Sequence, residues 1–353
     1  SNTQFGNCIC VLGDIDNDGV DDFAVAAPEW RDPAQLPGDP NVGRITLYSG
    51  ASRAVLWRYS PPIAPGQIGS GHREIGAAMT KIVDVDGDTI PDLVLGNHNT
   101  STSGMTHNGS VIVLSGALVP PASNPNGRFI FDVFGTDNYG YFGYSVVAFY
   151  HPHPGDDRTL IVGQPGSNEA LAPGSAKQGK VHHIAIGLNV HSIGPSFQHP
   201  AGDEMHLGWS LAVYDDISIP ENNNDDGNSW PAIIVSAPRR WWGPPQTAHG
   251  SDPSGSIVFL RGDNLQPVGN SFETQYPVPL PHVYANASFG FDIDVLGDLD
   301  DDGRREIAVS APGSAIKDGT PNPQQPYGEQ AGRVFILSQP YNMSQNFSIL
   351  FPA

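Results

Sequence analysis

An acidic loop of nine residues occurs three times in this chain, and its spacing limits what the chain can fold into. The acids hold positions 1, 3, 5 and 9 of each loop: Asp14, Asp16, Asp18, Asp22; Asp84, Asp86, Asp88, Asp92; Asp298, Asp300, Asp302, Glu306. In a tight loop alternate side chains can turn toward one point, where four carboxylates would repel one another unless a cation lies between them. Ligands that are all oxygen, on a flexible loop, suit Ca²⁺ better than Mg²⁺. The repeated spacing therefore predicts about three structural Ca²⁺ sites.

The residue at position 7 of each loop would add its backbone carbonyl to the metal, as in other calcium loops: Val20, Ile90, Arg304. An EF-hand is the main alternative, but it requires a glutamate at position 12 and a helix on each side. Position 12 of the first loop is Val25, and the flanks 8–12 and 23–27 are short and apolar, which is typical of strands. The pattern predicts a calcium loop within a β-hairpin.

The acidic loops belong to a longer repeat. Each loop follows a glycine by eight residues, and the same offset finds two degenerate copies; the five glycines are Gly6, Gly76, Gly143, Gly208 and Gly290. An apolar strand follows each loop, then a long turn, a third strand opened by glycine, and a weaker fourth strand. The chain thus divides into five units, at about residues 5–60, 68–134, 142–201, 207–280 and 289–353.

Five units of four antiparallel strands predict an all-β fold, a β-propeller in which radial closure leaves only short exposed edges. We expect one domain over residues 1–353. Five blades are favoured, and the alternative is a fragment of a seven-bladed propeller.

The motif resembles the FG-GAP repeat of integrin α-subunit propellers. The resemblance rests on Phe5-Gly6, the loop Asp14–Asp22 and Ala27-Pro28, and it extends over nearly the whole chain, with weaker agreement in units three and four. It implies Ca²⁺ on one face of the propeller and a protein or carbohydrate partner on the opposite face. Integrin propellers have seven repeats, whereas five are found here. The implied function is an extracellular adhesion or recognition module.

The two degenerate units differ in their loops. Residues 151–159 of unit three carry no carboxylate at positions 1, 3, 5 and 9, so no calcium is expected there. Unit four inserts residues 222–227 after Asp216, which leaves a distorted metal site open as an alternative.

Composition excludes several classes of protein. The formal net charge of −20 has the wrong sign for a nucleic-acid partner. No apolar run approaches the 18 residues of a membrane span, so no membrane insertion is expected. Calcium loops fit an extracellular, secreted or cell-surface protein, because millimolar Ca²⁺ fills weak sites there. Five sequons predict glycosylation, at Asn99, Asn108, Asn286, Asn342 and Asn346.

Enzyme activity is not expected from the sequence. A glycosidase would need paired carboxylates from the inner strands of several blades. At the compared inner-strand positions only the fifth unit has acids, Asp292 and Asp294, and no Gly-x-Ser-x-Gly elbow occurs.

The long loops between second and third strands are the predicted partner site. They carry aromatic and cationic residues of the kind that dominate interfaces: Trp30, His98, Arg239, Arg240, Trp241, Trp242 and Tyr327. The alternative is that these rings merely fill gaps over the propeller rim and bind no partner. The alternative functions are a lectin, and a structural subunit of a self-assembling extracellular filament or coat, which would pair through the chain ends.

Overall fold

A computed structural model describes residues 3–31, 41–61, 74–102, 104–119, 128–151, 157–166, 178–187, 190–198, 206–214, 230–238, 255–268, 288–314, 332–338 and 348–349. Throughout these ranges the regular structure is β-strand, and no helix occurs in them. The all-β prediction is therefore confirmed. No helix of the described residues is long and apolar enough to cross a membrane.

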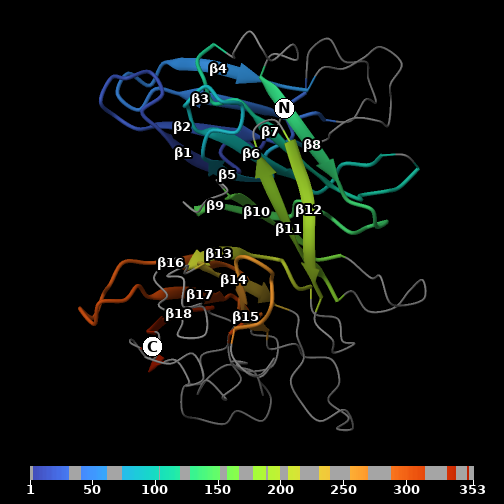
Figure 1. Ribbon diagram of the computed structural model, residues 1–353, viewed down its shortest axis with the longest axis vertical. Coiled ribbons are helices and arrows are strands. Elements are labelled where there is room, and N and C mark those ends of the chain that lie inside the picture. Colours follow the sequence, from blue (N-terminus) through green and yellow to red (C-terminus); the bar gives the residue numbers. More distant parts are fainter. Residues whose placement is uncertain are drawn as a thin grey trace, which may run out of the picture. The chain divides into compact units, whose positions relative to one another are not determined.

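The first two sheets each contain four strands in chain order, paired antiparallel. The first, in blue in Figure 1, is made of β1 (Ile9–Gly13), β2 (Asp22–Ala27), β3 (Arg44–Tyr48) and β4 (Val55–Tyr59). The second is made of β5 (Ala78–Ile82), β6 (Asp92–Asn97), β7 (Ser110–Leu114) and β8 (Phe129–Phe134).

The other three sheets repeat this order. The third contains β9 (Ser145–His151), β10 (Asp157–Gln164), β11 (Lys180–Gly187) and β12 (Val190–Phe197). The fourth shows three strands, β13 (Leu211–Tyr214), β14 (Ala232–Ala237) and β15 (Ser256–Arg261). The fifth contains β16 (Ile293–Val295), β17 (Ile307–Ala311), β18 (Arg333–Ser338) and β19 (Ser348–Ile349).

Burial within the sheets follows the sequence pattern. The second and third strands are nearly continuous runs of Val, Ile, Leu and Ala, and every residue of β6, β7 and β14 is buried. The first strands are more exposed, since Ile9 and Val11 of β1 are 60% and 52% exposed. Strands covered on both faces favour such apolar runs, whereas a strand with one open face does not require them.

In the first four repeats, the glycine that opens the third strand is required by a close approach to the next repeat. Gly109 has φ of 81° and forms a parallel bridge with Phe142. A Cβ atom at Gly109 would lie 2.1 Å from the carbonyl oxygen of Phe142. Gly255 and Phe289 repeat this contact with the same 2.1 Å separation. A side chain at either glycine would therefore force two successive repeats apart.

The chain divides into two compact units: residues 1–170 with 182–194, and residues 171–181 with 195–353. In the first unit one apolar cluster joins the sheets β1–β4 and β5–β8, and another joins β5–β8 to β9–β11. In the second unit a single cluster joins β13–β15 to β16–β18. Repeated four-stranded antiparallel sheets are consistent with propeller blades. The number of blades, their closure and the single domain stay predictions.

Candidate metal centres

The three acidic loops connect the first and second strands of their sheets, β1 to β2, β5 to β6 and β16 to β17. In each loop the carboxylate at position 1 accepts hydrogen bonds from the backbone N–H groups of positions 5 and 6. Asp14 accepts from Asp18 and Gly19, both at 2.9 Å. The equivalent distances are 3.2 and 2.8 Å at Asp84, and 3.1 and 2.9 Å at Asp298. The loops thus share one local conformation, as their common spacing predicts.

Positions 4 and 6 of every loop have left-handed backbone. The φ angles are 59° at Asn17 and 92° at Gly19 in the first loop, and 59° and 85° at Asp301 and Gly303 in the third. These two loops use Asn, Asp and Gly, the residues that tolerate this region. The second loop has glycine at position 4 and places Thr89 at position 6, with φ of 73°.

The position-9 carboxylate is held by backbone donors. Asp22 is fully buried, and its Oδ2 accepts from Ile15 N at 2.8 Å and Asp16 N at 3.2 Å. Its Oδ1 accepts from Gly50 N at 2.9 Å. Asp92 repeats this arrangement with Val85 N at 2.7 Å and Gly116 N at 3.1 Å. In the third loop Glu306 Oε2 accepts from Leu299 N. Position 9 therefore ties the loop to its own hairpin.

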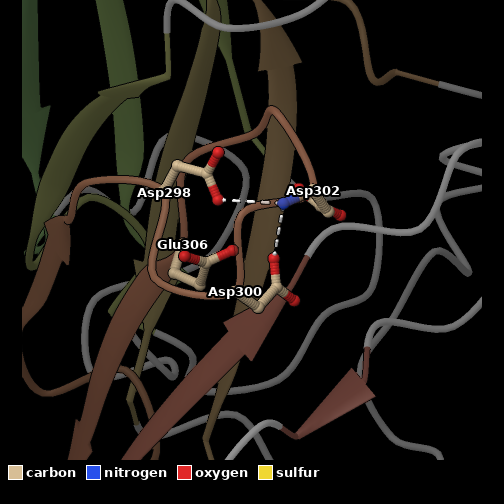
Figure 2. Close-up of side chains that lie close together, drawn as sticks. All are labelled: Asp298, Asp300, Asp302 and Glu306. Atoms are coloured by element: carbon tan, nitrogen blue, oxygen red, sulfur yellow. Dashed lines mark hydrogen bonds between the residues drawn. The ribbon is translucent and has the colours of Figure 1, made fainter.

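Carboxylates converge in all three loops. In the third, Asp298, Asp300, Asp302 and Glu306 all place an oxygen within 4.8 Å of the others. Figure 2 shows these four side chains on the loop, with the hydrogen bonds from Asp302 N to Asp298 and Asp300 dashed. In the first the group so defined is Asp14, Asp16 and Asp18, and in the second it is Asp84, Asp86 and Asp92. Asp22 and Asp88 lie outside these groups, so the structure brings together ten of the twelve predicted carboxylates.

Several of these oxygens are buried without a hydrogen bond from the described residues: both carboxylate oxygens of Asp86, Oδ2 of Asp88 and Oε1 of Glu306. A buried carboxylate oxygen that lacks a donor is costly, and a bound cation removes this cost. The donor set is entirely oxygen, which suits a hard divalent cation. The residues therefore fit the metal that the sequence implies. The carbonyls of Val20, Ile90 and Arg304 as ligands stay a prediction.

Crowding and burial change the acidity of the loops. Burial raises the pKa of Asp92 to about 8, against hydrogen bonds from Val85 and Gly116 that lower it. Burial, then the neighbouring carboxylate of Asp88, raises the pKa of Asp86. The pKa values of Asp16 and Glu306 are raised too, first by desolvation and then by nearby acids. In the absence of a cation, each of these groups therefore binds a proton more readily than an ordinary carboxylate does.

The turn after the third strand supports the acidic loop, a role that was not predicted from the sequence. Ser49 Oγ donates to Asp18 Oδ2 at 3.0 Å, and Gly50 N donates to Asp22. A Cβ atom at Gly116 would lie 1.9 Å from the Pro91 carbonyl oxygen. The repeated triplets Ser-Gly-Ala at 49–51 and 115–117 were the available signal.

Neighbouring repeats also contact the loops. Trp57 of β4 donates from Nε1 to the carbonyl of Gly116 at 3.2 Å, and the Arg128 guanidinium lies 4.2 Å from the Trp57 ring. In the second unit the buried Tyr214 of β13 donates from its hydroxyl to the carbonyl of Arg305 at 2.8 Å. The Trp57 bond joins the first repeat to the turn that supports the second loop, and the Tyr214 bond joins the fourth repeat to the acidic hairpin of the fifth.

The predicted partner residues fall mainly outside the described residues, as Arg239, Arg240, Trp241, Trp242 and Tyr327 do. Trp30 is half-buried, and the Arg44 guanidinium lies 4.2 Å from its ring. His98 is half-buried and contacts the rings of Tyr141 and Tyr144.

The sequons differ in accessibility. Asn108 is fully buried, and its Nδ2 donates to Thr102 Oγ1 and to the Gly135 carbonyl at 2.9 and 2.7 Å. A glycan on this nitrogen would break both bonds, so the folded structure contradicts the prediction for Asn108. Asn99 is half-buried. Asn286, Asn342 and Asn346 lie outside the described residues.

Comparison with a family model identifies the motif that carries the first acidic loop. Residues 5–48 match the model of the FG-GAP repeat family. The matched segment includes Phe5-Gly6, the first acidic loop and β3. The resemblance to integrin-type FG-GAP repeats that the sequence analysis stated is therefore confirmed.

Curated relatives of the chain include integrin α subunits. It is 29% identical to integrin alpha-4 of Xenopus laevis over 126 residues, which cover 36% of this chain and 11% of that protein. Over 99 residues, which cover 28% of this chain and 9% of that protein, it is 33% identical to integrin alpha-IIb of Mus musculus. Over 115 residues, which cover 32% of this chain and 8% of that protein, it is 31% identical to integrin alpha-PS2 of Drosophila melanogaster. The chain thus matches about a tenth of the length of these relatives.

Solved structures similar to the chain include enzymes. An exotype rhamnogalacturonan lyase matches with a TM-score of 0.43 and 12% identity, covering 92% of this chain and 46% of the lyase. A thermostable family-43 glycoside hydrolase matches with a TM-score of 0.37 and 8% identity, and the match covers 99% of this chain and 93% of the hydrolase.

The sequence predicted that the chain is not an enzyme. That exclusion of enzymes was wrong, because solved structures similar to the chain include lyases. That expectation rested on two inner-strand positions per repeat and on the paired carboxylates of a glycosidase, which is too narrow a test for other chemistries. Likeness at these TM-scores assigns no activity to this chain.

Proposed function

We propose that this chain is a calcium-stabilised recognition module of an extracellular or cell-surface protein, which binds a protein or glycan partner. The observation that carries the proposal is the shared geometry of the three acidic hairpins. In each, the position-1 carboxylate holds the loop and three or four carboxylates converge. The similarity to integrin α subunits supports an adhesive or ligand-binding role.

In this proposal Ca²⁺ is structural. It would neutralise the converged carboxylates and fix the end of the sheet that carries the acidic loop. The connection from second to third strand leaves the opposite end of the second strand, because successive strands are antiparallel. A partner would bind at that opposite end, which carries the connections from second to third strands.

The test has a metal arm and a ligand arm. Equilibrium dialysis should find about three Ca²⁺ ions per chain, and solid-phase binding to a panel of purified extracellular-matrix proteins and glycans should be lost in excess chelator. Asp86→Asn combined with Asp300→Asn should reduce the number of bound ions, while Asp294→Asn, an exposed acid outside the loops, should not. Absence of bound Ca²⁺, or of any ligand in the panel, would overturn the proposal.

A further inference from the structure

Five aromatic and imidazole rings gather at the end of β6 that is opposite to its acidic loop. The ring cluster consists of His98, His107, Tyr139, Tyr141 and Tyr144. His98 follows β6 directly, His107 lies in the connection from β6 to β7, and the three tyrosines precede β9. The cluster is therefore built where two successive repeats meet within the first unit.

The rings form a continuous series. Tyr139 is stacked on His107, with centroids 5.8 Å apart and planes 24° apart. His107 lies 5.7 Å from Tyr141, which lies 6.3 Å from His98, and His98 lies 5.0 Å from Tyr144. Tyr139, at one end of the series, is 48% exposed, so this end is open to solvent.

The backbone fixes these rings in place at a conformational cost. Tyr141 N donates to the His107 carbonyl at 3.0 Å, and Tyr139 N donates to the Thr106 carbonyl at 2.8 Å. His107, Tyr139 and Tyr141 have φ of 48°, 54° and 58°. Left-handed backbone costs a residue with a side chain about 1–2 kcal/mol. Such strain is frequent at binding sites, where the surrounding structure holds it.

The left-handed φ of Tyr141 is a feature that all five repeats share. Tyr141 lies two residues before a repeat glycine, and the matching residues of the other repeats also have left-handed φ: Gln4, Glu74, His206 and Ser288. His107 and Tyr139 lie at other positions, so the repeat motif does not account for their left-handed φ.

Polar groups border the rings. His107 Nδ1 lies 3.2 Å from Asn99 Oδ1, and Asn99 Nδ2 donates to Glu74. His98 Nδ1 is buried and has no hydrogen-bond partner among the described residues. Burial also lowers the pKa of His98, which favours its neutral imidazole. The ring series that ends at the exposed Tyr139 is thus bordered by an amide, a carboxylate and an imidazole, and a few polar groups beside aromatic rings are typical of a small-ligand site.

We propose that the ring cluster binds a neutral saccharide. The C–H face of a pyranose would pack on the exposed Tyr139 ring, and its hydroxyl groups would meet Asn99, Glu74 and the imidazoles. The net charge of −20 disfavours anionic glycans. A cationic ligand is the alternative that the experiment must separate, because the Glu74 carboxylate keeps its charge while it accepts from Asn99. This inference rests on the proposed function, since it specifies the ligand class and the place.

The experiment measures binding of a panel of neutral hexose and pentose oligosaccharides to the calcium-loaded chain, by array and then by isothermal titration calorimetry. Tyr139→Asn removes the exposed ring and keeps a residue that tolerates left-handed φ. Tyr150→Asn is the matched control, because Tyr150 is 41% exposed and lies on β9 outside the cluster. We expect Tyr139→Asn to weaken binding at least tenfold, and Tyr150→Asn to change it less than twofold.

Equal affinity of the Tyr139→Asn variant and the unchanged chain would overturn the inference. So would binding of arginine-rich or lysine-rich peptides, but of no neutral oligosaccharide, that is lost in Tyr139→Asn. If no oligosaccharide binds while a matrix protein does bind in Ca²⁺, the saccharide inference fails and the proposed function stands. If neither binds, the proposed function fails as well.

Discussion

At the scale of single residues, two positions in the second acidic loop are under local strain. Thr89 is a β-branched residue at φ of 73°, where the other two loops have glycine. Asp92 is a fully buried carboxylate with a raised pKa. Sequence spacing predicted that both belong to the loop, but it could not show that Asp22 and Asp92 would accept backbone hydrogen bonds. That role depends on Gly50 and Gly116, which lie more than 20 residues away in the chain.

Replacement of Thr89 should stabilise the protein. Thr89→Asn places a residue that tolerates left-handed φ, and should raise the free energy of unfolding by about 1 kcal/mol. Gly19→Thr makes the reverse change at the same loop position, where a Cβ would meet no atom within 4 Å, and should lower stability by about 1–2 kcal/mol. Urea unfolding in Ca²⁺ measures both. A loss of stability in Thr89→Asn would contradict this account.

Stability of the metal-free protein should depend on Asp92 protonation. Its pKa is about 8 in the folded state and near its ordinary 3.8 when unfolded. Between these values the folded chain holds more protons, so the free energy of unfolding should fall as pH rises from about 4 to 8. Asp16, Asp86 and Glu306 add to this in the same direction.

Asp92→Asn removes this titration, so urea unfolding in chelator should depend less on pH in the variant. Bound Ca²⁺ should also flatten the dependence, because it favours the ionised carboxylate. An identical pH dependence of the variant and the unchanged chain, both without metal, would contradict the assignment to Asp92.

At the scale of elements, the hairpins were predictable and their supports were not. The apolar flanks 8–12 and 23–27 of the first acidic loop predicted β1 and β2 to within one residue at each end. The supporting role of the turn after the third strand was not predicted, because its contacts with the loop are long-range. The ring cluster was missed for the same reason: His98, His107 and Tyr139 are separated in sequence and meet only through the pairing of two connections.

Substitution of the supporting glycine should disrupt the second hairpin. In Gly116→Ala the new Cβ would lie 1.9 Å from the Pro91 carbonyl oxygen, so the turn must move away from the loop. We expect a loss of about 2 kcal/mol or more, as for other overpacked sites. Gly297→Ala is the control, since a Cβ there meets nothing within 4 Å. Equal melting temperatures of the two variants would contradict the supporting role.

At the scale of the whole molecule, the repeat predicted sheets of four antiparallel strands, and four of the five described sheets have four. The single domain stays a prediction, because sequence repeats do not show whether a ring closes. If residues 1–353 are one propeller, differential scanning calorimetry should record one transition, and Gly116→Ala should shift the whole of it. Two separable transitions, of which Gly116→Ala shifts one, would contradict a single domain.

The most direct test of the account is the thermal unfolding of the chain in millimolar Ca²⁺ and in excess chelator. Ligands that bind only the folded state raise its stability, and structural metals do so strongly. We predict a clear rise in melting temperature with Ca²⁺. This rise should be smaller in Asp86→Asn and Asp300→Asn, and it should be unchanged in Asp294→Asn. A melting temperature that is the same with Ca²⁺ and with chelator would show that the acidic hairpins are not structural calcium sites.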